Sequence, residues 1–338
     1  MTTVLPQFVP HWGDDEVAAV TELLCNSDYL NEHETVRRFE KEFARSVGAK
    51  HCAAVTSGTA ALYIAACATL RGTDEPVAVP SHDGIFAHNA LVAADVTPSV
   101  ADVDESGLLD ASLVQGESVV VHANGRIAKR VGRVEDCAQA ITHHTKGAIS
   151  TYSFASTKHV TTAGQGGAIC CDSYEDFERI VSIKDHGRTD RQFLKPMSDN
   201  YDRWGLNFKM TEIQAAFGLV QLRDLPRRLR RLREMHAIYL DVLSASVEFD
   251  EMASGWYVDM FTDRAAHVIQ RLKKAGIHCR PYPRPLHMQE VAQTHVRKRT
   301  AFRNAEKRYS RGVYLPSTTN LSDDDVARAA QEVLAALG

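Results

Sequence analysis

The sequence predicts an α/β protein in which a large domain, built on a mixed and mostly parallel sheet of seven strands between helices, precedes a smaller α+β domain. Two observations support this fold class. In the first two thirds of the chain, short β-branched runs bounded by Gly, Pro, Asp or Ser alternate with helix-forming segments, which is the order of a doubly covered sheet. The chain has 338 residues, 44% of them hydrophobic, so it can bury one large core and a second, smaller one.

The first elements follow in a clear order. Residues 13–24 form an amphipathic helix whose acidic first turn complements the helix dipole, and residues 34–48 form a second helix that ends at Gly48. The apolar run 51–58 then leads through a tight turn into a strong helix former, residues 59–70. This strand, turn and helix make up the unit from which parallel sheets are wound.

The alternation continues in runs that we interpret as further strands, at residues 75–81, 97–104, 117–125, 132–140, 147–156 and 166–172. Residues 209–243 are helical for most of their length, with an interruption expected near Pro226. We therefore expect an N-terminal arm (1–11), a large domain (12–222), and a connecting helix with a small C-terminal domain (223–338).

Composition argues against several classes of partner. The formal net charge is -4, from 39 basic and 43 acidic residues scattered along the chain, so we expect binding to neither nucleic acid nor membrane. Seven cysteines without a CxxC pair suggest reduced thiols in a cytoplasm, and we find no export signal and no apolar stretch approaching the roughly 18 residues of a membrane helix. The histidine pairs lack metal-ligand spacing, so we expect no metal site.

Ser57, Gly58 and Thr59 lie between a predicted strand and helix. Glycine permits close backbone approach, the first N–H groups of the helix point outward and two hydroxyls are available, which together favour a phosphate. By themselves these residues are more typical of an ordinary helix cap.

Two charged residues follow predicted strands. Asp136 stands at a strand end, where it can hold a protonated ring nitrogen or act as a cap, and Lys158 follows another strand, where burial would make its amine usable for a Schiff base. A random lysine is far more often a surface charge. A candidate phosphate site, an acid and an amine nevertheless occur together in one α/β domain, and this combination is what pyridoxal phosphate requires.

At this point the sequence resembles the DegT/DnrJ/StrS family of pyridoxal-phosphate-dependent sugar aminotransferases, of the aspartate aminotransferase fold type I, as a compact member. The resemblance covers nearly the whole chain and lies in motifs that match the family in order: FEKEFARSVGAKHCAAVTSGTAAL, VEDCAQA, YSFASTKHVTTAGQGGAI, KDHGR, LNFKMTEIQAAFGLVQL, GIHCRPYPRPLH and LPSTTNLSDDDV.

The resemblance implies a role for each matching residue. Lys158 would form the Schiff base and move the proton, Asp136 would pair with the pyridinium nitrogen, and Gln139 would lie near the phenolic oxygen. The phosphate would be held by residues of two segments and, from the neighbouring subunit of a homodimer, by an asparagine: Ser57, Gly58, Thr59, Ser153 and Asn207. The implied reaction is ping-pong transfer from an amino-acid donor, by family habit L-glutamate, to a keto sugar that is usually nucleotide-linked.

One departure from the family concerns the cofactor ring. Where relatives usually present Thr and then a stacking aromatic residue, this chain has Asp83 and Gly84. Glycine cannot stack, so His82 or Phe86 are candidate substitutes, beside the alternative of a rearranged loop without an aromatic partner.

The other departures from the family pattern lie in segments that would border the substrate. The sequence therefore predicts the class of reaction better than it predicts the substrate. The stretches 125–134 and 256–268 are trimmed, and Gln165 replaces the usual Glu. Arg280 and His287 lie where the small domain would face the site, and a guanidinium there suits a carboxylate or phosphate, although packing of a Pro-rich loop explains them equally well. His186 has a loop-ordering or substrate-side role.

Three alternatives remain beside an aminotransferase that makes an amino sugar. The substrate is a keto cyclitol, the reaction is a dehydration, or the chain is a non-catalytic, cofactor-binding regulatory protein. The dehydratases of this family replace the lysine with histidine, so Lys158 argues against that reaction.

Overall fold

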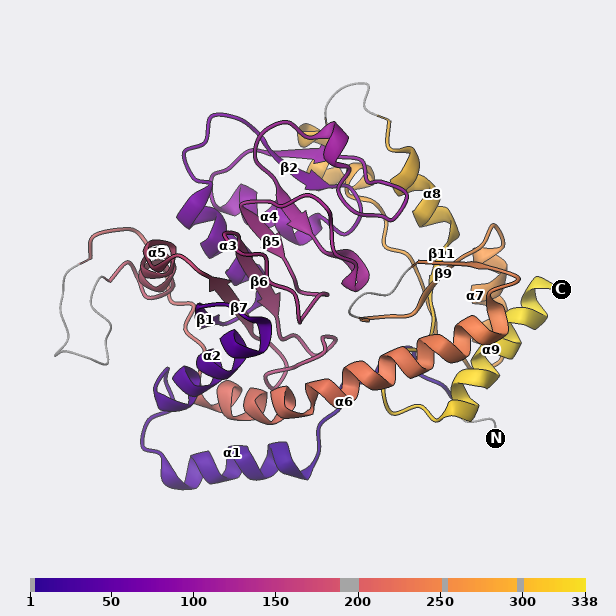
Figure 1. The fold of residues 1–338 in the computed structure, drawn as a ribbon, viewed down its shortest axis with the longest axis horizontal. Coiled ribbons are helices and arrows are strands. Elements are labelled where there is room, and N and C mark those ends of the chain that lie inside the picture. The colour runs from indigo at the N-terminus through magenta and orange to yellow at the C-terminus, as the bar shows by residue number, and fades with distance from the viewer. Residues whose placement is uncertain (1–3, 189–200, 251–254, 297–300) are drawn as a thin grey trace.

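The computed structural model describes residues 4–188, 201–250, 255–296 and 301–338 (Figure 1). The helices are α1 (Asp14–Asn26), α2 (Glu34–Val47), α3 (Gly58–Thr69), α4 (Ile85–Ala93), α5 (Tyr174–Lys184), α6 (Glu212–Leu243), α7 (Ala265–Lys274), α8 (Arg303–Arg311) and α9 (Asp323–Leu337). The strands are β1 (His51–Val55), β2 (Val77–Pro80), β3 (Pro98–Ala101), β4 (Val119–Val121), β5 (Val134–Asp136), β6 (Ile149–Ser153), β7 (Gly167–Cys171), β8 (Glu248–Phe249), β9 (Asp259–Phe261), β10 (Arg280–Pro281) and β11 (Gly312–Tyr314).

The central sheet is mixed, as the sequence predicts. Its order is β1-β7-β6-β5-β4, with β6, β5 and β4 parallel and β7 antiparallel to both of its neighbours. The expected count of seven strands is not exact, because the continuous sheet has five strands and β2 and β3 form a separate parallel pair. A β-bridge between Ala78 and Ser118 connects β2 to the edge of the larger sheet. One bridge is too little pairing to make the two sheets continuous.

Helices bury both faces of this sheet. In β1, Ala53 and Val55 belong to the core cluster under α3, α4 and α5, whereas Ala54 belongs to the cluster beneath α2 and α6. In β7, Ile169 and Ala168 divide in the same way. Because successive strand residues point to opposite faces, an apolar run is what a sheet covered on both sides requires.

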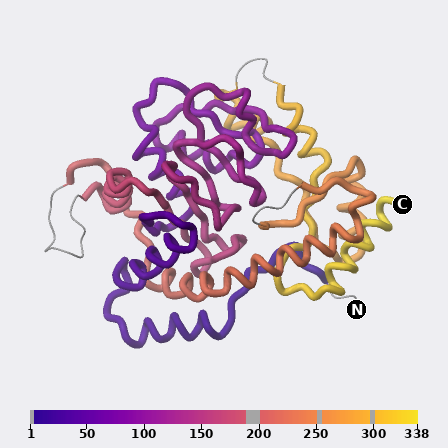
Figure 2. Tube along the Cα trace, in the orientation of Figure 1, coloured from indigo at the N-terminus to yellow at the C-terminus, as the bar shows by residue number. Residues whose placement is uncertain are grey.

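The long helix α6 connects this sheet to the C-terminal part of the chain (Figure 2). A capping box of Thr211 and Gln214 starts it, and it continues through Pro226, so the expected interruption there is wrong. The helix packs into a core on both sides of the proline, since Leu225 belongs to one core cluster and Tyr239 to another. This packing offsets the cost of an internal proline, about 3 kcal/mol.

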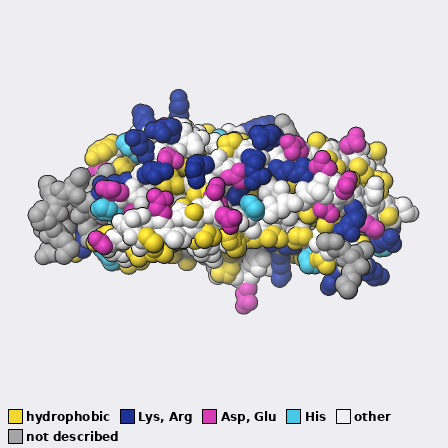
Figure 3. All heavy atoms as spheres, turned by 90° about the horizontal axis from the view of Figure 1, so that it is seen from below, with side chains coloured by type: hydrophobic (Ala, Val, Ile, Leu, Met, Phe, Trp, Pro, Cys, Tyr) yellow, Lys and Arg dark blue, Asp and Glu magenta, His cyan; other side chains and the backbone are white. Residues whose placement is uncertain are grey.

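A second sheet, of order β10-β11-β9-β8, packs with α7 and α9 around its own core cluster. The domain boundaries at residues 11 and 222 stay predictions. On the face drawn in Figure 3, basic and acidic side chains are interspersed. None of the helices in the described ranges combines the length and apolarity needed to cross a membrane.

Candidate active site

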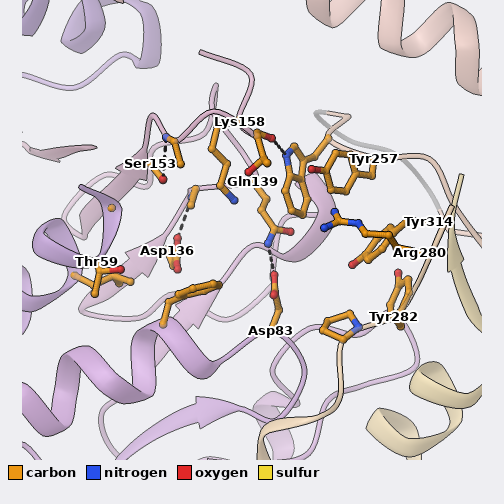
Figure 4. Close-up of a pocket in the computed structure, with 18 of the residues that line it drawn as sticks. Thr59, Asp83, Asp136, Gln139, Ser153, Lys158, Tyr257, Arg280, Tyr282 and Tyr314 are labelled. Carbon is orange, nitrogen blue, oxygen red and sulfur yellow. Dashed lines mark hydrogen bonds between the residues drawn. The ribbon is translucent and has the colours of Figure 1, made fainter. Parts of the chain in front are cut away.

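A cavity of about 840 Å³ opens where the sheet meets the C-terminal part of the chain (Figure 4). Its floor is formed by the N-terminus of α3 and the carboxyl ends of β5 and β6, the edge where ligands of open α/β sheets bind. Its other wall consists of aromatic and basic side chains from the second half of the chain: Trp256, Tyr257, Arg280, Tyr282, Arg284, Tyr309 and Tyr314.

Most of the residues that the sequence singles out line this one cavity. They are Ser57, Gly58, Thr59, Phe86, Asp136, Gln139, Ser153, Lys158 and Arg280. Four others do not line it: His82, His186, Asn207 and His287.

The N-terminus of α3 is positioned by two close approaches. A Cβ at Gly58 would lie 2.6 Å from the Cβ of Ser153, and one at Gly167 would lie 2.4 Å from the carbonyl oxygen of Ser57, so both glycines allow the helix to begin directly against the sheet. The hydroxyl of Ser57 accepts the N–H of Ala60 at 3.1 Å and is the helix cap. Thr59 is exposed, and its side chain faces the cavity.

Asp136 is buried at the end of β5, where its Oδ1 accepts the N–H of Ala138 at 2.9 Å. Burial raises the pKa of this carboxyl, opposed by the backbone hydrogen bond and by the nearby Lys158. The Asp136 carboxylate is therefore desolvated, which makes it a strong partner for a protonated ring nitrogen.

Lys158 follows β6 through a turn in which its N–H donates to the carbonyl of Ala155 at 2.9 Å. Its Nζ lies 4.1 Å from the ring centroid of Trp256, and its side chain points into the cavity. Burial lowers the pKa of the Lys158 amine, while the carboxylates of Asp83 and Asp136 raise it. An amine of lowered pKa that shares its cavity with two carboxylates is suited both to nucleophilic attack and to proton transfer.

The side chain of Gln139 is held at both ends. Its Oε1 accepts the N–H of Asn124 at 2.6 Å, and its Nε2 donates to Asp83. Asp83 is a residue of the cavity that the sequence analysis noted only as a departure from the family and did not predict as a site residue. Burial raises the pKa of Asp83 to about 6, so this second carboxylate is ionised at neutral pH.

The wall from the second half of the chain was also missed, apart from Arg280. The guanidinium of Arg280 lies over the ring of Tyr257, 5.3 Å from its centroid. The rings of Tyr282 and Tyr314 stack on one another, at 4.6 Å and 19°. The only signal in the sequence is the density of aromatic and basic residues in 255–262 and 280–284, which also fits ordinary packing.

Of the two candidate stacking residues, only Phe86 is in place to act. Phe86 lines the cavity with 52% of its surface exposed. The prediction for His82 is corrected, because its imidazole is fully buried and stacked on Tyr282, at 4.9 Å and 11°, outside the cavity lining.

The other predicted residues lie elsewhere. His287 is half-buried, with Nδ1 2.5 Å from the hydroxyl of Ser81 and its ring stacked on Phe302 at 4.0 Å, so it supports the loop rather than lining the cavity. His186 and Asn207 are both exposed, and a β-bridge pairs Asn207 with Asp185. Neither reaches the cavity of its own chain.

Among the described residues, His122, Glu135 and Cys137 approach metal-site geometry, with ligand atoms within 4.8 Å of one another. The N–H of Ala128 donates to His122 Nδ1 at 3.1 Å, and His122 Nε2 lies 3.2 Å from a carboxylate oxygen of Glu135. In this structure His122 and Glu135 form a buried hydrogen-bonded pair.

A family model described as the DegT/DnrJ/EryC1/StrS aminotransferase family matches residues 10–334. The spore coat polysaccharide biosynthesis protein SpsC of Bacillus subtilis is 30% identical over 95% of this chain and 94% of its own. The GDP-perosamine synthase of Escherichia coli O157:H7 is 27% identical over 95% of both chains.

Solved structures have the same fold. The structure of DesI in the presence of its TDP-sugar product is 26% identical, with a TM-score of 0.84 over 100% of this chain and 94% of that one. The sugar aminotransferase Spr1654 of Streptococcus pneumoniae, described as putative and solved in PLP and PMP forms, superposes with a TM-score of 0.88 over 99% of this chain and 98% of its own. At 18% and 19% identity, that likeness concerns the fold alone.

Proposed function

The chain belongs to the DegT/DnrJ/EryC1/StrS aminotransferase family and is a pyridoxal-phosphate-dependent sugar aminotransferase, and we propose that it moves an amino group from L-glutamate to a nucleotide-linked keto sugar. One observation carries the proposal: Lys158, Asp136 and the N-terminus of α3 meet in a single cavity. A relative that makes GDP-perosamine and a structure with a TDP-sugar product support the nucleotide-linked class.

The residues present fit pyridoxal phosphate. Gly58 lets the N-terminus of α3 begin directly against Ser153, and both residues line the cavity together with Thr59, so the backbone N–H groups and hydroxyls of a helix N-terminus are available to a phosphate. Asp136 offers a buried carboxylate for the ring nitrogen, and Lys158 offers an amine for the aldehyde.

When bound, pyridoxal phosphate supplies the aldehyde and a ring that withdraws electrons from the carbon undergoing proton transfer. Lys158 would hold the cofactor through its amine and, when that amine is free, would hold and move a proton at Nζ. The charge of Asp136 would favour a proton on the ring nitrogen. The hydroxyls of Thr59 and Ser153 and the first N–H groups of α3 would hold the phosphate, whereas the Ser57 hydroxyl is the cap of that helix.

We assign the ring contact to Phe86. A side chain at Gly84 would meet the carbonyl oxygen of Pro80 at 2.0 Å, so the stacking residue of the family has no room at this position. Phe86 is in the first turn of α4 and already lines the cavity. An aromatic face against the cofactor ring contributes about 1 kcal/mol beyond its buried area.

The substrates enter past the basic wall. Arg280 and Arg284 are exposed residues at the cavity, where guanidinium groups suit the carboxylate of glutamate or a sugar-linked phosphate. We further propose a cytoplasmic homodimer in which the exposed Asn207 serves the phosphate of the neighbouring site.

The test is the absorbance of the purified protein with pyridoxal phosphate. We expect the band of the lysine-bound cofactor in the wild type and in Lys146→Ala, an exposed control, and its loss in Lys158→Ala. L-Glutamate should convert the band to that of the aminated cofactor, and a nucleotide-linked keto sugar should restore it.

Each alternative predicts a different result. If a keto cyclitol restored the cofactor band and no nucleotide-linked sugar did, the substrate would be a cyclitol. If the sugar lost a hydroxyl and gained no amino group, the enzyme would be a dehydratase. A spectrum that no amino acid changes would indicate a cofactor-binding regulatory protein.

A further inference from the structure

We propose that Asp83 is a positioning residue whose negative charge holds a proton on the nitrogen of Lys158. This inference rests on the proposed function, because it concerns the amine that carries the cofactor. Asp83 lines the same cavity as Lys158 and Asp136, and its side chain points toward Gln139 and the cavity interior (Figure 4).

The backbone aims the Asp83 side chain inward. Asp83 adopts a left-handed conformation, φ 59°, which Asp and Asn tolerate better than other non-glycine residues. The following residue, Gly84, packs against the carbonyl of Pro80 too closely for any side chain, which closes a tight turn from Pro80 to Gly84. The backbone conformation of this turn therefore determines the direction of the Asp83 carboxylate.

A chain of hydrogen bonds then holds the carboxylate in place. Gln139 donates to Asp83 from Nε2 and accepts the Asn124 N–H at its Oε1, which leaves the amide one orientation. The side chain of Asn124 donates to Asp259 Oδ2 at 2.8 Å and to the Tyr282 hydroxyl at 2.7 Å. The position of Asp83 is thus fixed by residues from both halves of the molecule.

Several charges act on the pair. Burial raises the pKa of Asp83 to about 6, while Lys158, the Gln139 hydrogen bond and Arg126 lower it and Asp136 raises it further. The other groups that face the pair are the guanidinium of Arg280, which lowers the pKa of Lys158, and the phenols of Tyr257 and Tyr314, whose pKa values Asp83 raises.

Asp83 and Asp136 are two carboxylates of the cavity whose charges oppose the effect of burial on the pKa of Lys158. Desolvation lowers the pKa of the Lys158 amine, and the charges of Asp83 and Asp136 both raise it. Asp136 is in addition the partner assigned to the ring nitrogen, which leaves Asp83 as the carboxylate committed to Lys158. A buried nitrogen next to a carboxylate keeps its proton to a higher pH.

The test is a pH titration of the holoenzyme absorbance, since the bound cofactor absorbs differently when the Lys158 nitrogen is protonated. Asp83→Asn keeps the shape, the left-handed backbone and an acceptor for Gln139, and removes only the charge. We expect the midpoint of the titration to fall by about one pH unit or more, a tenfold loss of proton affinity. Asp83→Glu, which restores the charge, should bring the midpoint back toward that of the wild type.

Two variants make the test decisive. Asp95→Asn is the matched control, because Asp95 has the same left-handed backbone, φ 61°, and is exposed outside the cavity, so its midpoint should not change. Asp83→Gly suits a left-handed position best and should reproduce the fall if the Asn variant folds poorly. An unchanged midpoint in folded, cofactor-loaded Asp83→Asn or Asp83→Gly, or an equal fall in Asp83→Glu, would overturn the inference. A wild type without the cofactor band would instead contradict the proposed function.

Discussion

A Cβ at Gly84 would lie only 2.0 Å from the carbonyl oxygen of Pro80. The clash is with backbone, so no side-chain rotation relieves it, although φ at Gly84 is an ordinary −85°. This close approach leaves no room at position 84 for the aromatic side chain that the resemblance to the family leads us to expect there.

We predict that Gly84→Ala lowers the free energy of unfolding by about 3 kcal/mol, because the turn must open to admit the methyl group. Gly13→Ala is the matched control: its Cβ would meet nothing within 4 Å, and the loss at a helix cap should stay near 1 kcal/mol or below. Urea denaturation of both variants measures the difference. An equal loss of unfolding free energy in the two variants would show that the turn at Gly84 can open at little cost.

A second prediction concerns Phe86. Phe86→Ala should weaken pyridoxal phosphate binding about tenfold, because the ring contact is lost, with little effect on folding, because half of the side chain is already exposed. Phe86→Tyr should retain most of the affinity. The dissociation constant, measured by adding cofactor to the stripped protein, tests this.

Val92→Ala removes an exposed apolar side chain from the other end of the same helix and serves as the control. Cofactor binding that is the same in Phe86→Ala and Val92→Ala would favour the alternative of a site without an aromatic partner.

The residues that sequence reasoning found are those whose position follows from local structure. Asp136 and Lys158 each follow a strand of the central sheet, and the carboxyl ends of neighbouring parallel strands come together whatever the rest of the chain does. Gly58 and Thr59 follow from the same rule, since a helix that begins at a strand end must present its N-terminus there.

What was missed depends on tertiary packing. Tyr257, Tyr282 and Tyr314 are brought to the cavity by a second sheet, and nothing in their local patterns distinguishes a cavity wall from a core. His82 was proposed to face the cofactor, yet its ring packs on Tyr282, a residue 200 positions away along the chain. The passage of α6 through Pro226 likewise depends on packing from both sides.

A third prediction separates phosphate binding from ring binding. Thr59→Val replaces the hydroxyl with a methyl group of the same shape, so pyridoxal phosphate should bind roughly ten- to hundredfold more weakly, the value of one hydrogen bond to a charged group. Binding of pyridoxal, which has no phosphate, should not change.

Thr69→Val provides the control for this experiment, since Thr69 is in the same helix and its hydroxyl donates to the carbonyl of Ala65. If Thr59→Val weakened pyridoxal and pyridoxal phosphate equally, Thr59 would contact some other part of the cofactor.

The last prediction concerns stability in acid and depends on His82. Neither ring nitrogen of His82 has a hydrogen-bond partner among the described residues. Burial, together with Arg308 and Arg126, lowers its pKa to about 3. Above about pH 6.5 the ring is neutral in both the folded and the unfolded chain. As the pH falls from there toward 3, only the unfolded chain binds the proton, so the folded state loses stability.

His82→Phe removes this proton binding and keeps a flat ring for Tyr282. At neutral pH the variant should gain about 1 to 3 kcal/mol, because an unpaired buried polar group is removed. The gain should grow by about 2 kcal/mol between pH 7 and pH 5, the cost that the wild type incurs over that interval. Urea denaturation at both pH values, with the exposed His267→Gln as control, measures this. Stability curves of wild type and His82→Phe that run parallel would mean that His82 takes up its proton within the folded protein.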